Sequence, residues 1–189
     1  MHDTSRVDEI ELPFRGWFKG TVPVMHAPEG DQTVLELRCP LGSLKVFGLV
    51  DTPDHQEGGE ELGMGMFSRQ RIRCVVPRKY THVQIVPSIK SPGFARWQLG
   101  YRAASSLPEL HGSVSGGHTA VFRYTGRRTT AQLTVPKSYA YLKHYRFVGN
   151  HFTDLTFANA PFRGKVEIPG PGLIVVDSVV SSWTLTLPE

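Results

Sequence analysis

Apolar and polar side chains alternate along most of the chain with a period of two residues. Residues 34–39, 44–46 and 71–76 show this pattern in the first half, and residues 130–135 and 183–187 show it in the second. A period of two is typical of β-strands that bury one face and leave the other in water. Clusters of glycine and proline separate these runs, as turns between short strands require. Almost no run has the period of an amphipathic helix, so the chain is predicted to be all-β.

The two halves of the chain carry the same series of patterns in the same order. Four pairs of segments match: 33–40 (TVLELRCP) with 129–136 (TTAQLTVP), 46–50 with 145–148, 71–74 after Phe67 with 165–168 after Phe162, and 97–99 (WQL) with 183–185 (WTL). Each match is short, but matches that recur in one order along the chain indicate a tandem duplication.

The duplication predicts the fold class and the division of the chain. We expect an all-β protein of two tandem, related antiparallel β-sandwich halves that are jelly-roll-like and packed together. The first half, residues 1–104, includes an N-terminal arm, and the second half covers residues 105–189. The link between them is residues 103–109 (AASSLPE), which are small and polar with one proline. A link this short predicts that the halves pack against each other.

The second half closes with a distinctive pair of segments. Residues 164–177 (GKVEIPGPGLIVVD) are followed by residues 182–187 (SWTLTL). This succession resembles the closing hairpin of small bacterial β-sandwich accessory modules, such as pre-peptidase C-terminal-like domains. The resemblance implies a jelly-roll-like appendage without catalytic activity. The chain departs from those modules in lacking their acidic calcium-binding pattern in this half and a secretion signal.

Composition and charge narrow the classes of function. The chain has 189 residues, of which 40% are hydrophobic and 20% charged, as in globular rather than disordered proteins. Its formal net charge of +4 is too small and too dispersed for a dedicated nucleic-acid binder. Cys39 and Cys74 lie in predicted strands, where we expect buried thiols. No signal peptide and no apolar run of membrane-spanning length are visible, which predicts a cytoplasmic or particle-associated protein without a membrane span.

Residue types that serve in active sites occur, but not in the patterns that catalysis requires. The eight histidines are dispersed, and no pair has the spacing of a zinc site on a helix. Residues 112–117 (GSVSGG) resemble a nucleophile elbow only loosely, because no helix is predicted after them. We therefore predict no catalytic residues, no metal site and no cofactor.

Residues 51–61 (DTPDHQEGGEE) are the most acidic stretch of the chain. Carboxylates beside glycine turns supply the oxygen ligands that a hard cation prefers, but their spacing fits no calcium-binding loop. We expect a solvated or partner-facing loop between two strands, with cation binding as the alternative.

Basic residues gather around the predicted strand 71–76. Arg69, Arg71 and Arg73 alternate on one face of this strand, and Arg78 and Lys79 follow it directly. These five side chains are candidates for contact with an anionic partner, although solubility and protection of an edge strand explain the same pattern. No aromatic residue alternates with them on this strand, as stacking on nucleic-acid bases requires. Nucleic acid is therefore not the expected partner.

One predicted strand carries an aromatic strip on one face. The strip consists of Tyr139, Tyr141, Tyr145 and Phe147 with Lys143 among them, and the other face holds Ala140, Leu142 and Val148. Tyrosine is frequent at contact surfaces because it buries a large area at a small loss of entropy. The strip is the predicted interaction surface, and three uses remain open: packing on the other half of the chain, contact with another subunit, or stacking on a sugar.

These expectations favour binding over catalysis. The leading hypothesis is a non-enzymatic structural or interaction protein, a subunit or decoration protein of a larger assembly such as a virion or a similar particle. Its partner would be another protein or a second copy of the chain. The alternatives are a module that binds carbohydrate or another ligand through the aromatic strip, and a weak binder of anionic partners, either nucleic acid or a lipid surface.

Overall fold

The computed structural model describes residues 11–88, 95–148, 152–178 and 182–188, and between residues 66 and 70 it describes the backbone only. The first half forms the strands β1 (Phe14–Trp17), β2 (Gly20–Pro23), β3 (Thr33–Thr52), β4 (His55–Val76), β5 (His82–Pro87) and β6 (Arg96–Ala103). A 3₁₀ turn at Ala104–Ser106 leads into the second half. There follow β7 (Ser113–Gly116), β8 (Ala120–Tyr124), β9 (Thr129–Val135), β10 (Tyr139–Tyr145), β11 (Phe152–Asn159), β12 (Phe162–Ile168), β13 (Gly172–Asp177) and β14 (Trp183–Thr186).

In the first half, the long hairpin of β3 and β4 passes from one layer of a sandwich to the other. β3 pairs with β6 through its first part and with β5 from Leu44 onward, while β4 follows β3 along its length. The change of partner coincides with a register shift between Arg38 and Leu41. Two layers result. The inner layer contains β1, β6 and the adjoining parts of β3 and β4, and the outer layer contains β2, β5 and the remaining parts.

The second half repeats this arrangement with a separate strand for each segment. Its inner sheet has the order β11-β10-β13-β8, and its outer sheet has the order β12-β9-β14-β7. The inner layer of the first half (β1, β6, β3, β4) corresponds to the outer sheet (β7, β14, β9, β12), and the outer layer corresponds to the inner sheet. Two four-stranded antiparallel sheets connected in this way form a jelly roll. The predicted fold class, two tandem and related sandwich halves, is confirmed.

The register of the strands shows which residues of the two halves correspond. Leu37 pairs with Leu99 in the first half, and Leu133 pairs with Leu185 in the second. In the first half, residues 33–40 therefore lie opposite residues 97–99. In the second half, residues 129–136 lie opposite residues 183–185 in the same way. Two of the four sequence matches therefore describe equivalent positions in space.

The match that follows Phe67 is shifted by two residues in the structure. Leu37 pairs with Ile72, whereas Leu133 pairs with Gly164. Ile72 therefore corresponds to Gly164 and not to Val166, as the sequence pattern had placed it. The cause is a register shift in the β3–β4 ladder beyond Leu37, which absorbs extra residues in β4. Inserted residues of this kind leave the alternation on both sides intact, so sequence alone does not count them.

A tryptophan closes the first jelly roll over its first turn. Trp97 of β6 pairs with Gly16 of β1, and its indole N–H donates a hydrogen bond to the carbonyl oxygen of Phe18 at 3.1 Å. A Cβ atom on Gly16 would lie 2.4 Å from the Trp97 ring. Glycine at this position is therefore a packing requirement, because the ring lies directly on the backbone.

The second jelly roll repeats this closure. Trp183 of β14 pairs with Gly116 of β7, and its indole N–H donates to the carbonyl oxygen of His118 at 3.0 Å. A Cβ atom on Gly116 would again lie 2.4 Å from the tryptophan ring. The duplication thus preserves a hydrogen bond, a close ring contact and a strand pairing together.

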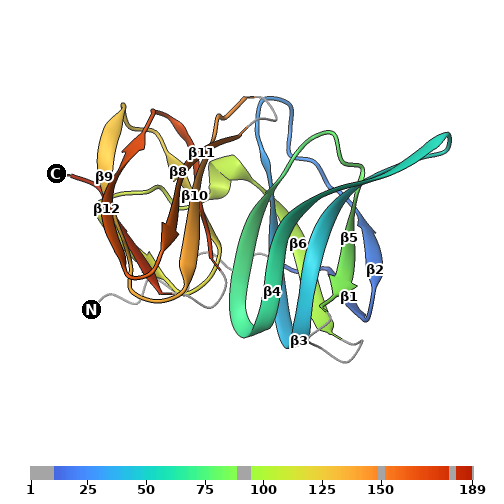
Figure 1. Cartoon of the computed structure of the whole chain (residues 1–189). Helices are drawn as coiled ribbons and strands as arrows, with labels where there is room; N and C mark the ends of the chain where they lie inside the picture. Colours follow the sequence, from blue (N-terminus) through green and yellow to red (C-terminus); the bar gives the residue numbers. More distant parts are fainter. Residues whose placement is uncertain (1–10, 89–94, 149–151, 179–181, 189) are drawn as a thin grey trace.

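The two jelly rolls meet face to face, with the inner layer against the inner sheet (Figure 1). Buried apolar side chains fill this junction: Val34 and Val75 from the first half, Ala104 and Leu107 from the link, and Val121, Leu173 and Val175 from the second half. The side-chain amide of Gln32 donates to the carbonyl oxygens of Arg146 and Phe147 at 3.4 and 3.3 Å. Each jelly roll also has a core of its own. The division of the chain at residue 104 into two domains stays a prediction.

The acidic stretch 51–61 is a β-hairpin rather than the expected loop. Thr52 pairs with His55, and the two strands continue without a break from the turn between them (Figure 1). Two of its carboxylates have partners nearby: Glu57 lies 3.1 Å from His55, and Glu61 forms an ion pair with Lys45 at 2.6 Å. Glycine and charged residues have low strand propensity, and pairing with β3 overrides that propensity here.

Candidate functional site

The predicted aromatic strip lies on β10, in the inner sheet of the second jelly roll. Ala140 and Leu142 point into the core and are fully buried. Tyr139 and Tyr141 point the opposite way, and 39% and 40% of their surfaces remain exposed. The alternation of β10 therefore separates core from surface as the sequence predicts. Val148 is an exception, because β10 ends at Tyr145 and 75% of Val148 is exposed instead of facing the core.

The neighbouring edge strand β11 adds two aromatic residues that sequence reasoning missed. Phe157 pairs with Tyr141, and Phe152 pairs with Tyr145. Phe152 and Phe157 are five residues apart, so strict alternation places them on opposite faces of the strand. A β-bulge at Leu155 inserts one residue and brings both rings to the same face. The sequence signal for this bulge is Leu155, an apolar residue that breaks the polar–apolar alternation between Phe152 and Phe157.

Four aromatic rings thus gather on the outward surface of β10 and β11, and we call this set the aromatic face: Tyr139, Tyr141, Phe152 and Phe157. The rings of Tyr141 and Phe157 are 4.6 Å apart at 30°, and Tyr139 meets Tyr141 edge-on at 5.9 Å. Between 39% and 54% of each of these side chains is exposed. Contact between the Tyr139, Tyr141 and Phe157 rings fixes their orientation, while the Phe152 ring lies 5.2 Å from the Tyr145 ring. The surface is therefore preorganised rather than a loose set of side chains.

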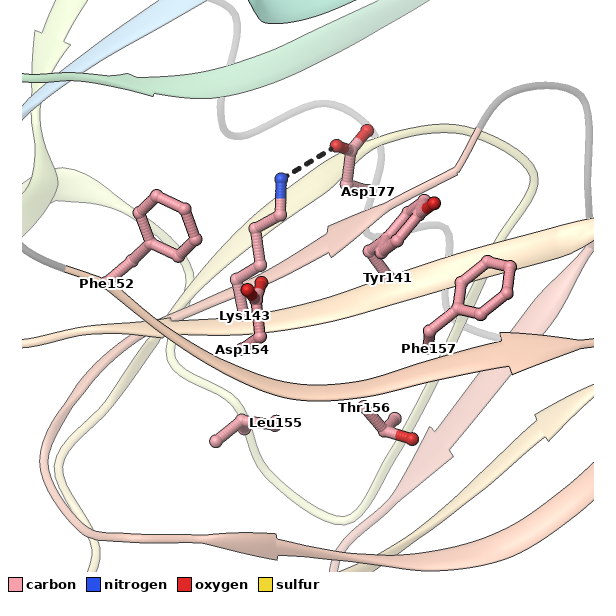
Figure 2. A pocket seen from close by; sticks show the side chains of 8 residues that line it. All are labelled: Tyr141, Lys143, Phe152, Asp154, Leu155, Thr156, Phe157 and Asp177. Carbon is pink, nitrogen blue, oxygen red and sulfur yellow. Dashed lines mark hydrogen bonds and ion pairs between the residues drawn. The ribbon is translucent and has the colours of Figure 1, made fainter. Parts of the chain in front are cut away.

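Beside the aromatic face lies a groove that reaches the first jelly roll. One hollow of about 440 Å³ is lined by residues of β10, β11 and β13, all drawn in Figure 2. A second hollow of about 210 Å³ shares Tyr141 and Asp177 with the first and is closed by Glu61, Gly63 and Met64 of β4. The first hollow thus belongs to the second jelly roll alone, and the second hollow is formed where the two halves pack together.

Positively and negatively charged side chains line this groove. The Lys143 ammonium forms an ion pair with Asp177 at 3.2 Å and lies 5.8 Å from the Tyr141 ring and 5.4 Å from the Phe152 ring (Figure 2). Asp154 stands opposite Lys143 in the strand register, and within the described part of the chain it makes no hydrogen bond or ion pair. The groove thus offers aromatic surface, a free hydrogen-bond acceptor and a positive charge that is already paired.

The other two members of the predicted strip serve a different purpose. Tyr145 and Phe147 pack against the apolar junction between the jelly rolls. Burial raises the pKa of Tyr145, and the negative charges of Glu60 and Asp177 raise it further. The strip is therefore divided: one part holds the halves of the chain together, and the other part faces solvent.

The five basic candidates do not form one surface. Arg71 and Arg73 donate hydrogen bonds to Glu36 at 3.0 and 2.7 Å. Arg78 donates to backbone carbonyl oxygens of the turn that begins at Ala27, and Lys79 forms an ion pair with Glu60 at 3.5 Å. The side chain of Arg69 lies outside the described residues. The anion that Arg71 and Arg73 contact is thus a carboxylate of the same chain.

Glu36 is the centre of a buried ion cluster that sequence reasoning missed. Its side chain has no exposed surface, and it also accepts a hydrogen bond from Arg102 at 2.9 Å. Burial by itself raises the pKa of Glu36, but hydrogen bonds and charge from Arg102, Arg73 and Arg71 outweigh burial and lower the pKa below its ordinary value. Glu36 is thus an ionised group in the folded protein, and it lies next to the junction.

The two cysteines and His144 are buried inside the jelly rolls. Cys39 and Cys74 are buried, as predicted, and burial raises the pKa of their thiols to about 11 and about 12. His144 lies in the core of the second jelly roll, with its Nε2 at 3.2 Å from the carbonyl oxygens of Gly170 and Pro171. Among the described residues, no three His, Cys, Asp or Glu side chains come together as ligands for a metal ion.

Comparison with known proteins gives no family for this chain. No family model matches it, and no curated protein matches it either. The resemblance to pre-peptidase C-terminal-like domains is thus supported only at the level of a jelly-roll-like β-fold. Nor does the described part of the chain contain a helix with the length and apolar character needed to cross a membrane.

Solved structures with some likeness to the chain are distant. The regulatory domain of Toxoplasma gondii PKA, crystallised with cAMP, has 6% identity and a TM-score of 0.26 over 92% of this chain and 77% of that chain. Protein Ylba from E. coli has 8% identity and a TM-score of 0.25 over 92% and 76%. Bacteroides uniformis beta-glucuronidase has 12% identity and a TM-score of 0.29 over 93% and 22%. Likenesses this weak carry no argument about the chain, and the assignment of the jelly roll rests on its strand order.

Proposed function

We propose that this protein is a non-enzymatic interaction protein that works as a subunit of a larger assembly, such as a virion or a similar particle. The observation that carries the proposal is the aromatic face, whose four rings are exposed beside a groove that joins both jelly rolls. Exposed apolar clusters with a polar rim mark binding surfaces in soluble proteins, and aromatic residues are enriched at the centre of interfaces.

A second copy of the same chain is the partner that the charges favour. Lys143, Asp154 and Asp177 place both signs of charge on one small surface. In a two-fold symmetric contact, each patch meets its own copy, so a surface with both signs is able to pair with itself. A partner of a single charge sign would leave one of these groups opposed by a like charge.

Light scattering after size-exclusion chromatography tests this proposal. The wild-type chain should elute as a dimer or larger assembly, and Tyr141→Ala/Phe157→Ala should elute as a monomer with an unchanged unfolding transition. Thr184→Ala, on the exposed face of β14, is the matched control and should keep the assembly. A wild-type monomer at high protein concentration would sink the proposal of self-assembly.

Carbohydrate binding is the second candidate, and the composition of the hollow favours it. The Tyr141 and Phe157 rings form a platform for the apolar face of a sugar, while Asp154 and Thr156 supply hydrogen-bond partners for its hydroxyl groups. Retention of the wild-type chain on a glycan column, with loss of retention in Tyr141→Ala, would support this function. Absence of retention across a diverse set of glycans would exclude it.

A further inference from the structure

The inner layer carries a second exposed apolar cluster at the end of β1, on the surface that the junction leaves open. Trp17 of β1 pairs with Arg96 of β6, and Arg96 pairs in turn with Leu41 of β3. Residues opposite one another in neighbouring strands share a face, so the three side chains form one row. Trp17 is 51% exposed and Leu41 is 38% exposed, while the Arg96 guanidinium lies 5.5 Å from the Trp17 ring centre.

Phe18 extends this cluster into the turn between β1 and β2. Its side chain is 58% exposed, and its φ of 65° lies in the left-handed region, which a bulky side chain rarely adopts. Two hydrogen bonds fix the backbone there. The N–H of Phe18 donates to the carbonyl oxygen of Ala95 at 3.0 Å, and its own carbonyl accepts from Trp97. The turn therefore presents an aromatic ring to solvent from a rigid base.

The fold itself does not require these aromatic residues. The equivalent turn of the second jelly roll has Gly117 and His118 in place of Trp17 and Phe18, and it accepts the same tryptophan hydrogen bond. His118 does not adopt a positive φ. A strained, exposed ring at a position where the repeat has none indicates selection for contact with something outside the chain.

Among the described residues, the charge around this turn has a single sign. Arg15, Lys19 and Arg96 are exposed, and Arg15 and Lys19 make no hydrogen bond or ion pair within the described part of the chain. The described segments that meet at this end, residues 14–20, 38–43 and 95–98, contain no carboxylate. The cluster therefore combines exposed aromatic and aliphatic side chains with unopposed positive charge.

We propose that the Trp17–Phe18 turn docks on the surface of an anionic lipid bilayer. Tryptophan and phenylalanine favour the interface between headgroups and acyl chains, and neighbouring Lys and Arg side chains bind anionic headgroups. Stacking on a nucleic-acid base is less favoured, because Arg96 already covers a face of the Trp17 ring. This surface is separate from the aromatic face, so the docking proposal does not depend on the proposed assembly.

Vesicle binding tests the proposal with the full chain. Vesicles of phosphatidylcholine alone and vesicles with added phosphatidylserine are compared by flotation and by tryptophan fluorescence. Trp97 and Trp183 are only 5% and 2% exposed, so a blue shift on vesicle binding reports Trp17. We expect binding to the anionic vesicles, a blue shift, and weaker binding as salt rises.

The matched variant transplants the turn of the second jelly roll into the first. Trp17→Gly/Phe18→His should bind anionic vesicles at least about tenfold more weakly, while Tyr141→Ala/Phe157→Ala should bind like the wild type. An unfolding curve shows whether the turn variant still folds. Lys19→Glu is a second variant, which keeps Trp17 and Phe18 in place and should also weaken binding to the anionic vesicles. Absence of binding to anionic vesicles, or equal binding by the turn variant, would overturn the proposal. So would a preference of the wild type for single-stranded DNA over vesicles.

Discussion

The two jelly rolls of this chain share one strand order and one tryptophan closure, yet they differ wherever their surroundings differ. The clearest case is Glu36 of β3 and its counterpart Gln132 of β9. Glu36 is fully buried and held by three arginines, whereas Gln132 is partly exposed and donates to the carbonyl oxygen of Gly164 at 2.9 Å. Equivalent backbone positions thus carry a buried ion and a surface amide. The strand order and the tryptophan closure repeat because both jelly rolls need them to fold. Glu36 and Gln132 differ because one position is buried and the other is partly exposed.

The same comparison shows that two equivalent faces of the jelly rolls differ in polarity. The inner layer of the first half meets its neighbour through Val34 and Val75. The corresponding face of the second half, on the outer sheet, is polar: Ser113 bonds Thr186 at 2.9 Å and Ser115 bonds Thr184 at 2.8 Å. A hydroxyl-rich face has little apolar area to bury, so burying it would yield less free energy than burying the valine-rich face of the first half.

The largest effect is expected from the shared tryptophans. Trp97→Ala and Trp183→Ala each remove a buried ring and a hydrogen bond, and each should lower the free energy of unfolding by about 3–5 kcal/mol. Because the apolar junction couples the halves, both variants should unfold in one transition measured by urea titration with circular dichroism. Two separate transitions in Trp183→Ala would show that the jelly rolls fold independently.

The next effect distinguishes the two halves at their matched polar position. Glu36→Gln leaves three arginines beside a buried neutral group, and the free energy of unfolding should fall by about 3 kcal/mol. Gln132→Glu at the corresponding position removes the hydrogen bond to the Gly164 carbonyl on a partly exposed side chain, and it should lower the free energy of unfolding by about 1 kcal/mol at most. Urea titration at neutral pH measures both. Equal losses in the two variants would contradict the difference in burial.

The charge of Glu36 also predicts a pH dependence. The pKa of this carboxyl is lowered in the folded state from an ordinary value of 4.5, which the unfolded chain keeps. The unfolded chain therefore binds more protons below 4.5, and the stabilisation by Glu36 is complete above that pH and lost as pH falls through the folded pKa. The difference in stability between wild type and Glu36→Gln should shrink as the pH falls below 4.5. A difference that stays constant down to pH 3 would show that folding does not lower the pKa of Glu36.

The sequence predicts the strands well and the contacts between halves poorly, for a physical reason. Period-two alternation reveals which side of β10 faces the core, and Ala140 and Leu142 are buried as predicted. Alternation does not reveal what covers the opposite side. The sequence pattern places Glu36 on a solvent-facing side of its strand, whereas in the structure it is buried and bonded to Arg71, Arg73 and Arg102.

Bulges limit sequence reasoning in a second way. The bulge at Leu155 brings Phe152 and Phe157 to one face, although their spacing predicts opposite faces. Half of the aromatic face was therefore missed, while the half on the regular strand β10 was predicted. Strict alternation predicts which side chains of a strand share a face, and one inserted residue makes that prediction wrong.

The division of the aromatic strip predicts opposite outcomes for two tyrosines on one strand. Tyr145 packs into the junction, so Tyr145→Ala should lower the free energy of unfolding by about 2 kcal/mol. Tyr141 is 40% exposed, so Tyr141→Ala should cost less than about 1 kcal/mol and act on binding or assembly instead. Thermal unfolding and light scattering on the same samples separate the two effects. A larger loss of stability in Tyr141→Ala than in Tyr145→Ala would reverse the assignment.

The smallest expected effect is at the first turn of each jelly roll. Here the prediction concerns whether glycine raises or lowers the free energy of unfolding. Phe18→Gly relieves the left-handed strain of a bulky residue but makes the unfolded chain more flexible, so stability should stay level or rise by up to about 1 kcal/mol. His118→Gly relieves no such strain, because its φ is not positive, and stability should fall by about 1 kcal/mol. Thermal unfolding of both variants gives the comparison. If glycine destabilises both turns equally, Phe18 is not strained, and strain at this turn does not mark its ring as kept for an external contact.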